Sequence, residues 1–176
     1  NMLDDTVPEA LKDKVANEVK VYSDTLGWAG TIDSFYEHFD GTFSIIDMFT
    51  GSSYNKVIVD KLMEYGGQAL AIEDSVKNRK KLQIMLYAFI LKTEIPDIKF
   101  KNLKVHWMKN DYTAVLKTTN SDVDVTSFLN MIEAYLIAEK PDVYAKVKEK
   151  SYNAFDPNEY YSTPTSILQE EGSIEQ

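Results

Sequence analysis

Three consecutive segments of alternating apolar and polar residues fill residues 18–49 and constrain the fold more than any other feature. Alternation of this kind is typical of β-strands that bury one face. Turn residues separate the segments, and Asp40-Gly41 is a residue pair typical of a type I′ hairpin turn. The strands and turns, in chain order, are 18–23, 24–27, 28–39, 40–41 and 42–49. We therefore predict that residues 19–49 form an antiparallel meander.

Helices and a second pair of strands are predicted around this meander. Residues 73–92 carry apolar side chains at helical spacing, and residues 97–109 and 112–119 alternate like the strands of a hairpin. Further helices are predicted at 7–16, at 55–65 with a break at Gly66-Gly67, at 123–138 and after Pro141. This order predicts an α/β (α+β) domain with a mixed central β-sheet flanked by helices. We assign residues 1–152 to that domain and residues 153–176 to an acidic C-terminal tail.

The composition excludes several classes of site and location. The 176 residues are enough for one domain with a substantial core. The absence of cysteine excludes disulfides and thiolate metal sites, and it is consistent with a reducing compartment such as the cytoplasm. No apolar run approaches the roughly 20 residues that span a bilayer, so we expect no transmembrane helix and no membrane partner.

Charge is distributed unevenly along the chain. The formal net charge of −9 argues against nucleic-acid binding, which depends on Lys and Arg. Residues 77–117, however, carry ten basic and three acidic side chains, a net charge of +7. This block indicates an anion-binding surface, or else a set of solvated lysines on outer faces. The acidic residues 121–176 also allow a third interpretation, a protein that binds a partner by imitating the charge of DNA.

Three carboxylates occupy the predicted meander in positions that suggest a metal site. Glu18 begins the first strand, Asp33 lies within the second, and Asp47 lies near the end of the third. Carboxylates that converge at one sheet edge repel one another, and a bound Mg²⁺ or Mn²⁺ would offset that repulsion. The alternatives are that a lysine pairs with Asp33 and that Asp47 caps a turn.

The predicted helix at 73–92 carries a polar pair. Gln83 and Tyr87 are four residues apart and therefore share one face of the helix, so their amide and hydroxyl groups can reach the same ligand. Taken alone, this pair fits a polar edge on a core helix better than a ligand site.

Read together, these motifs resemble the PD-(D/E)XK nuclease superfamily. The likeness is to its RecB-like exonucleases, including mitochondrial genome maintenance and phage exonucleases. The shared pattern is a glutamate, a "G-x-x-D" strand fifteen residues later, a hairpin, an "I-D-x-K-T" strand and a helix with "Q-x-x-x-Y". Here Glu18 precedes Asp33 by fifteen residues. The other matches are "GTID" at 30–33, "IIDMFTG" at 45–51 and "QIMLY" at 83–87.

The resemblance implies a restriction-endonuclease-like core and a Mg²⁺- or Mn²⁺-dependent deoxyribonuclease that hydrolyses phosphodiester bonds, most simply as an exonuclease. It implies that Glu18, Asp33, Asp47 and the backbone carbonyl of Met48 bind the metal. Gln83 and Tyr87 would steady the active site or the scissile phosphate. DNA, as single strands or ends, would follow the Lys-rich region 77–117. Residues suggested for base stacking are Trp28, Tyr36, Tyr54 and Trp107.

Phe49 departs from the family pattern. The family has a lysine at this position, and its positive charge orients the attacking water or stabilises the charge of the transition state. Either another cation replaces it, with Lys56 and Lys20 as candidates, or the domain binds DNA without cutting it well, or the substitution is engineered. The alternative function is therefore a catalytically impaired nuclease-fold module that binds nucleic acid or a protein partner.

Overall fold

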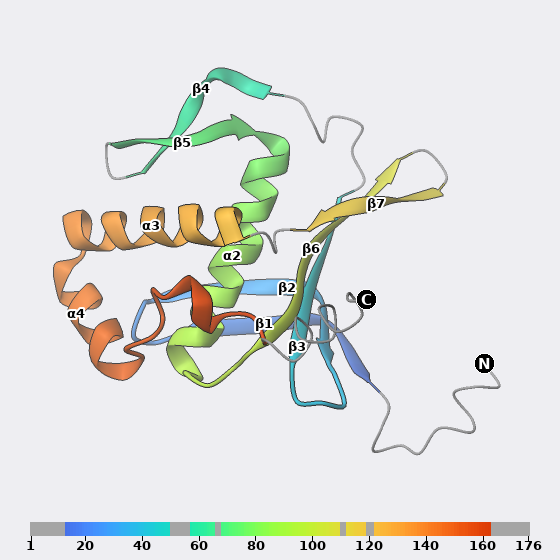
Figure 1. The fold of residues 1–176 in the computed structure, drawn as a ribbon, viewed down its shortest axis with the longest axis horizontal. Coiled ribbons are helices and arrows are strands. Elements are labelled where there is room, and N and C mark those ends of the chain that lie inside the picture. Colours follow the sequence, from blue (N-terminus) through green and yellow to red (C-terminus); the bar gives the residue numbers. More distant parts are fainter. Residues whose placement is uncertain (1–12, 50–56, 66–67, 110–111, 119–121, 163–176) are drawn as a thin grey trace, which may run out of the picture.

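Five strands form one mixed β-sheet in the order β1-β2-β3-β6-β7 (Figure 1). The computed structural model describes residues 13–49, 57–65, 68–109, 112–118 and 122–162. The strands of this sheet are β1 (Lys14–Ser23), β2 (Trp28–Glu37), β3 (Phe43–Phe49), β6 (Phe100–Lys109) and β7 (Tyr112–Thr118). Neighbouring strands are antiparallel except β3 and β6, which are parallel. The predicted α+β class, mixed sheet and antiparallel meander are therefore confirmed.

Helix α2 (Val76–Glu94) lies at the centre of the molecule (Figure 1). It contacts β1, β2, β3 and β6 on one side, and α3 (Asp122–Glu139) and α4 (Pro141–Lys150) on the other. Ser75 caps its N-terminus by accepting a hydrogen bond from the Asn78 N–H at 3.1 Å. Its buried residues join those of β3, β6 and α3 in one apolar core. No helix of the described chain is long and apolar enough to cross a membrane.

The β2–β3 connection is a three-residue turn. The His38 N–H donates to the Thr42 carbonyl at 2.8 Å, and the Gly41 N–H donates to the His38 carbonyl at 2.9 Å. Gly41 has a φ of 87°, as expected for the glycine that ends a three-residue hairpin loop with a bulge. The hairpin is thus confirmed, but the predicted two-residue turn is wrong by one residue.

The predicted helix over 55–65 is wrong. This region contains β4 (Val57–Tyr65), which pairs with β5 (Gln68–Ser75) in a separate two-stranded sheet that packs near α2 and α3. Three consecutive β-branched residues begin β4, and a Gly-Gly pair between two short segments is a hairpin signal. The helix predicted at 7–16 is also wrong over residues 14–16, where β1 begins; residues 7–12 lie outside the described chain.

The predicted C-terminal tail begins too early. After α4, residues 151–162 pack against the domain through a short 3₁₀ helix η2 (Pro157–Glu159). Tyr160 is completely buried, its hydroxyl donates to the Ala154 carbonyl at 2.6 Å, and its ring stacks on Phe100. Residues 163–176 lie outside the described chain.

Candidate functional site

Helix α2 brings three polar side chains together near two of the predicted carboxylates. Lys80, Gln83 and Tyr87 are separated by three and four residues, so they follow one face of the helix. The positive charge of Lys80 acts on Asp47, and the negative charges of Asp47 and Asp33 act on Tyr87. The structure therefore places five polar residues of α2, β2 and β3 in one neighbourhood.

Strands β2 and β3 separate where these carboxylates lie. Their pairing ends at Ser34↔Ile46 and does not continue to Asp33. Instead, Oδ2 of Asp33 accepts a hydrogen bond from the Met48 N–H at 2.8 Å. A side chain thus satisfies a backbone donor beyond the end of the ladder, and the strands can diverge without leaving that donor unpaired.

The backbone is irregular at the same level of the sheet. Ile32 is completely buried, and the next side chain, Asp33, also lies on the inner side of the sheet, where it hydrogen-bonds with Asp47. Consecutive side chains of a regular strand point to opposite faces, so β2 departs from regular geometry here. On β1, Glu18 lies between the pairs Asn17↔Ser34 and Val19↔Ile32 and has a φ of 53°. Such a left-handed conformation is uncommon for a residue other than glycine and occurs often at functional sites.

Asp47 is buried beside a second carboxylate. Only 3% of the residue is exposed. Burial, a hydrogen bond with the Asp33 carboxyl group and the negative charge of Asp33 raise the pKa of Asp47 to about 7, while the charge of Lys80 opposes that rise. Near neutral pH the two carboxyl groups therefore share a proton for part of the time, and a cation could replace that proton.

Tyr87 completes the polar group from the helix. Burial and the charges of Asp47 and Asp33 raise the pKa of its hydroxyl, although hydrogen bonds with the Thr31 backbone and with Gln83 lower it. A Cβ added at Gly30 would overlap Cε1 of Tyr87 and would lie 3.1 Å from Cδ1. The glycine of the "GTID" segment is therefore required for the tyrosine ring to lie against β2. Gln83 and Tyr87 are adjacent, as their spacing predicted.

Two cavities open along this face of α2. One, of about 340 Å³, is lined by Trp28, Gly30, Ile90 and Tyr87, among others. The other, of about 350 Å³, is lined by Arg79 and Lys80 among others. Gln83 and Leu86 line both cavities, so the two share a wall. We call the first the apolar hollow after Trp28 and Ile90, and the second the basic hollow after Arg79 and Lys80, although most of the lining of the second is also apolar.

The remaining predicted ligands do not join the pair. Glu18 is exposed, and among the described residues no group of three or more His, Cys, Asp or Glu side chains could hold a metal ion. Met48 lies beside the site: its backbone N–H contacts Asp33, and its side chain is 42% exposed. Lys56 lies outside the described chain. Lys20 is exposed and lies between Val19 and Val21, which face α2, so it points to the opposite face of the sheet.

The predicted basic block does not form one surface. Lys92 is completely buried, which excludes it from any DNA path. Lys104 lies between Leu103 and Val105, whose buried side chains occupy the inner face of β6, so it points to the opposite face from Asp47. The block nevertheless contributes Arg79 and Lys80 to the basic hollow.

The aromatic side chains predicted for stacking have separate environments. Trp28 lines the apolar hollow and packs against Phe89, with ring centres 6.0 Å apart. Tyr36 stacks on His38 at the far end of the sheet. Tyr54 and the side chain of Trp107 lie outside what the structure describes.

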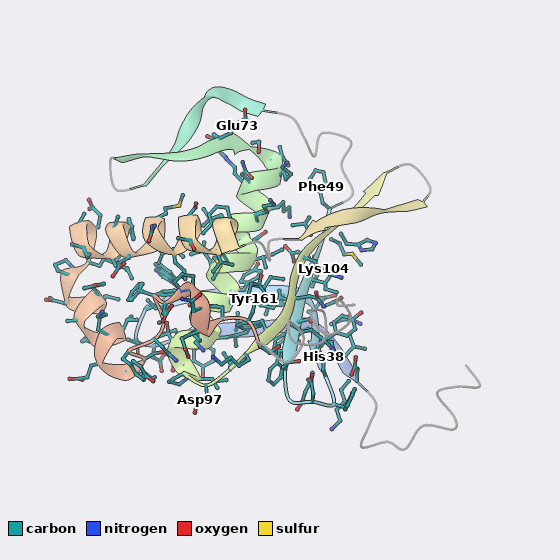
Figure 2. The ribbon with its side chains drawn as sticks, in the orientation of Figure 1. His38, Phe49, Glu73, Asp97, Lys104 and Tyr161 are labelled. Carbon is teal, nitrogen blue, oxygen red and sulfur yellow. The ribbon has the colours of Figure 1, made fainter. Side chains whose placement is uncertain are left out.

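An Asp-His-Ser cluster, in which His38 and Ser44 are buried and Asp13 is exposed, was not predicted from the sequence. Nδ1 of His38 lies 2.8 Å from Asp13, and Nε2 lies 2.7 Å from Oγ of Ser44. Figure 2 shows His38 at the opposite end of β3 from Phe49. Ser44 is 1% exposed, and its oxygen also accepts the Asn102 N–H, so no substrate could reach it. Despite its resemblance to a catalytic triad, the cluster ties β1, β2, β3 and β6 together.

No protein-family model matches the chain, and the search of curated proteins found no match either.

Proposed function

We propose that this protein is a metal-dependent nuclease that hydrolyses phosphodiester bonds in DNA. The observation that carries the proposal is the pairing of Asp33 with Asp47 under Gln83 and Tyr87. Because Asp47 is nearly inaccessible to water, two adjacent carboxylates at this position are costly unless a cation binds them. The same elements support the finer proposal of a restriction-endonuclease-like core, because α2 is the helix of the connection between the parallel strands β3 and β6, which also contains the β4–β5 hairpin.

The donor set fits a hard divalent cation. Mg²⁺ and Mn²⁺ prefer oxygen ligands, need few protein ligands and retain several waters. Asp33 and Asp47 would hold the ion, and the carbonyl of Met48, whose N–H donates to Asp33, is a backbone candidate for a further ligand. A cation at this position would favour the ionised form of Asp47, which burial disfavours. When bound, the ion would polarise a phosphoryl oxygen and lower the pKa of a water.

The protein's own residues supply orientation and neutral donors. The Met48 N–H fixes one oxygen of Asp33 and so orients its carboxylate. The raised pKa of Tyr87 keeps its hydroxyl protonated at neutral pH, so that it can donate a hydrogen bond to a phosphate oxygen. The Gln83 amide has two N–H donors and can do the same one helical turn away.

The substrate we propose is a single strand or a frayed end of DNA. Lys80 offers positive charge for the phosphates, and Lys77 lies one turn before it. The apolar hollow beside Tyr87 suits an unpaired base, with Trp28 available for stacking. An unpaired base can enter such a hollow, whereas a base within a duplex cannot without being flipped out.

End-labelled DNA incubated with Mg²⁺ or Mn²⁺ tests the proposal. We expect shortened products from the wild type and none from Asp47→Ala. Titration of Mn²⁺ in a calorimeter should show binding that both Asp47→Ala and Asp33→Ala abolish. Cleavage no greater than that of Asp47→Ala, on any single-stranded or duplex DNA, would refute the nuclease.

The second candidate is a nuclease-fold module that binds nucleic acid or a protein partner without cutting. Phe49 at the family's lysine position and the exposed Glu18 favour it. This candidate predicts DNA affinity that increases as salt falls, without product in any metal. It also predicts that Phe49→Lys switches cleavage on if only the cation is missing.

A further inference from the structure

Lys80 of α2 lies close to Phe49 and acts on the carboxylate pair. Its Nζ lies 6.0 Å from the centre of the Phe49 ring, and its charge acts on Asp47. Figure 2 shows Phe49 at the end of β3 close to the N-terminal part of α2. Phe49 follows Asp47 by two positions on β3, so their side chains share a face of the sheet.

Two other basic residues near the site, Arg79 and Lys20, are directed elsewhere. Arg79 makes two hydrogen bonds to Asp74, from Nε at 2.7 Å and from Nη2 at 3.0 Å. Lys20 lies on the opposite face of the sheet, as described above. Lys80, by contrast, lines the basic hollow together with Gln83, one turn along the same face of α2.

We propose that Lys80 is a catalytic residue that supplies from α2 the positive charge missing at position 49, and that the ring of Phe49 positions its ammonium group. An aromatic face within about 6 Å attracts a cation and limits its motion. In this arrangement the ring of Phe49 helps to hold Lys80, the lysine that replaces the one missing at position 49. This inference rests on the proposed function, because it concerns the same hydrolysis.

The chemistry requires a cation at this place. A water oxygen forms a bond to phosphorus and releases a proton to solvent, while the bond from phosphorus to the leaving oxygen breaks and that oxygen takes up a proton. Negative charge grows on the non-bridging oxygens in the transition state. An ammonium group positioned beside these oxygens stabilises that charge without reorganising during the reaction.

The experiment compares Lys80→Met with the wild type and with Lys20→Met in a single-turnover cleavage assay. Methionine keeps most of the length of the side chain and removes its charge. We expect Lys80→Met to lower the cleavage rate at saturating DNA on the order of 10²- to 10³-fold, with little change in Mn²⁺ affinity or thermal stability. Lys20→Met should cut at the wild-type rate.

Relocating the charge provides the stricter test. Phe49→Lys combined with Lys80→Met should recover at least tenfold of the lost rate, because position 49 lies on the same face as Asp47. A purely structural role for Lys80 would not allow this rescue.

Two outcomes would overturn the inference while leaving the nuclease intact. In one, Lys80→Met cuts like the wild type and Lys56→Met does not. In the other, Lys80→Met only weakens DNA binding and leaves the saturated rate unchanged. Failure of the proposed function is distinct, because the wild type itself would then cut no better than Asp47→Ala.

Discussion

The two ends of α2 bury polar groups in opposite ways. Near its C-terminus, Lys92 is completely buried, and its Nζ donates to the carbonyl oxygens of Ile98 at 2.9 Å and Glu159 at 2.8 Å. The hydroxyl of Ser151 donates to the Lys92 carbonyl. Near its N-terminus, the helix faces Asp33 and Asp47, two like charges that oppose each other.

The pKa values show how differently the two ends treat charge. Burial lowers the pKa of Lys92 to about 8, so its ammonium group stays mostly protonated at neutral pH among carbonyl partners. Burial and Asp33 raise the pKa of Asp47 to about 7, so near neutral pH about half of the Asp47 side chains hold a proton. The protein alone provides hydrogen-bond acceptors for the buried charge of Lys92, but it does not compensate the buried charge of Asp47.

This contrast separates a structural residue from a candidate functional one. A buried ion that donates to buried carbonyl groups holds elements together, here α2 with Ile98 and η2. A buried ion held beside a like charge gains stability only from something the chain does not provide. The following predictions test that division.

The largest effect is expected at the C-terminal end of α2, where Lys92 is buried. Lys92→Ala should lower the free energy of unfolding by about 3–5 kcal/mol, because it opens a cavity and leaves the buried Ile98 carbonyl without its donor. Urea unfolding measures it. Lys99→Ala is the matched control: Lys99 donates to the same Glu159 carbonyl at 3.0 Å but is about one-third exposed, and should cost about 1 kcal/mol or less. Equal losses in the two variants would contradict the structural role of Lys92.

At the carboxylate pair we expect a substitution to raise the free energy of unfolding instead of lowering it. At pH 8 without metal, Asp47→Asn should raise the free energy of unfolding by about 2–4 kcal/mol, since the wild type must ionise a carboxyl whose pKa is raised from 3.8 to about 7. Between these values the folded state binds more protons than the unfolded state, so wild-type stability falls as pH rises through this window. At pH 3 the gain should vanish.

Thermal unfolding with a chelator at several pH values measures this effect. Asp24→Asn, in the exposed turn between β1 and β2, is the control and should change little at any pH. A variant Asp47→Asn that is less stable than the wild type at pH 8 would show that the protein satisfies Asp47 by itself.

Local patterns in the sequence were sufficient to predict most strands and helices of the fold, but not all of them. The meander, the long helix and the second hairpin follow from alternation and helical periodicity, which record burial directly. The β4–β5 hairpin was mistaken for a helix because short apolar segments satisfy both periods. The packing of Tyr160 was missed because one buried aromatic in a polar segment leaves no periodic signal.

The candidate site was predictable only in part for a related reason. Asp33, Asp47, Gln83 and Tyr87 were identified from spacing, and the structure brings these four together. Lys80 was not singled out, because its importance depends on which helix face meets β3. The sequence shows that a lysine is absent from position 49, but only the packing of α2 shows which lysine lies nearby.

A smaller effect is expected from Gly30, which allows Tyr87 to approach β2. Gly30→Ala should lower the free energy of unfolding by about 1–3 kcal/mol, because the new methyl group would overlap the tyrosine ring. Cleavage should fall at least tenfold as the hydroxyl moves. The same substitution in a Tyr87→Ala background removes the clash and should cost less than about 1 kcal/mol. Equal costs in both backgrounds would mean that the glycine matters for another reason.

The smallest effect is expected from single surface charges. It distinguishes the N-terminal end of α2, near the carboxylate pair, from the C-terminal end, near Lys92. Lys77→Ala, one turn before Lys80, should weaken DNA binding by roughly two- to fivefold and reduce the salt dependence of binding by about one counterion. Lys99→Ala should change neither, because its ammonium group is bonded to the carbonyl and carboxylate of Glu159. Fluorescence anisotropy with a labelled single strand, over a range of salt and without divalent metal, measures both. If Lys99→Ala weakened binding as much as Lys77→Ala, DNA would not be confined to the N-terminal end of α2. The basic residues of 77–117 would then act as one surface.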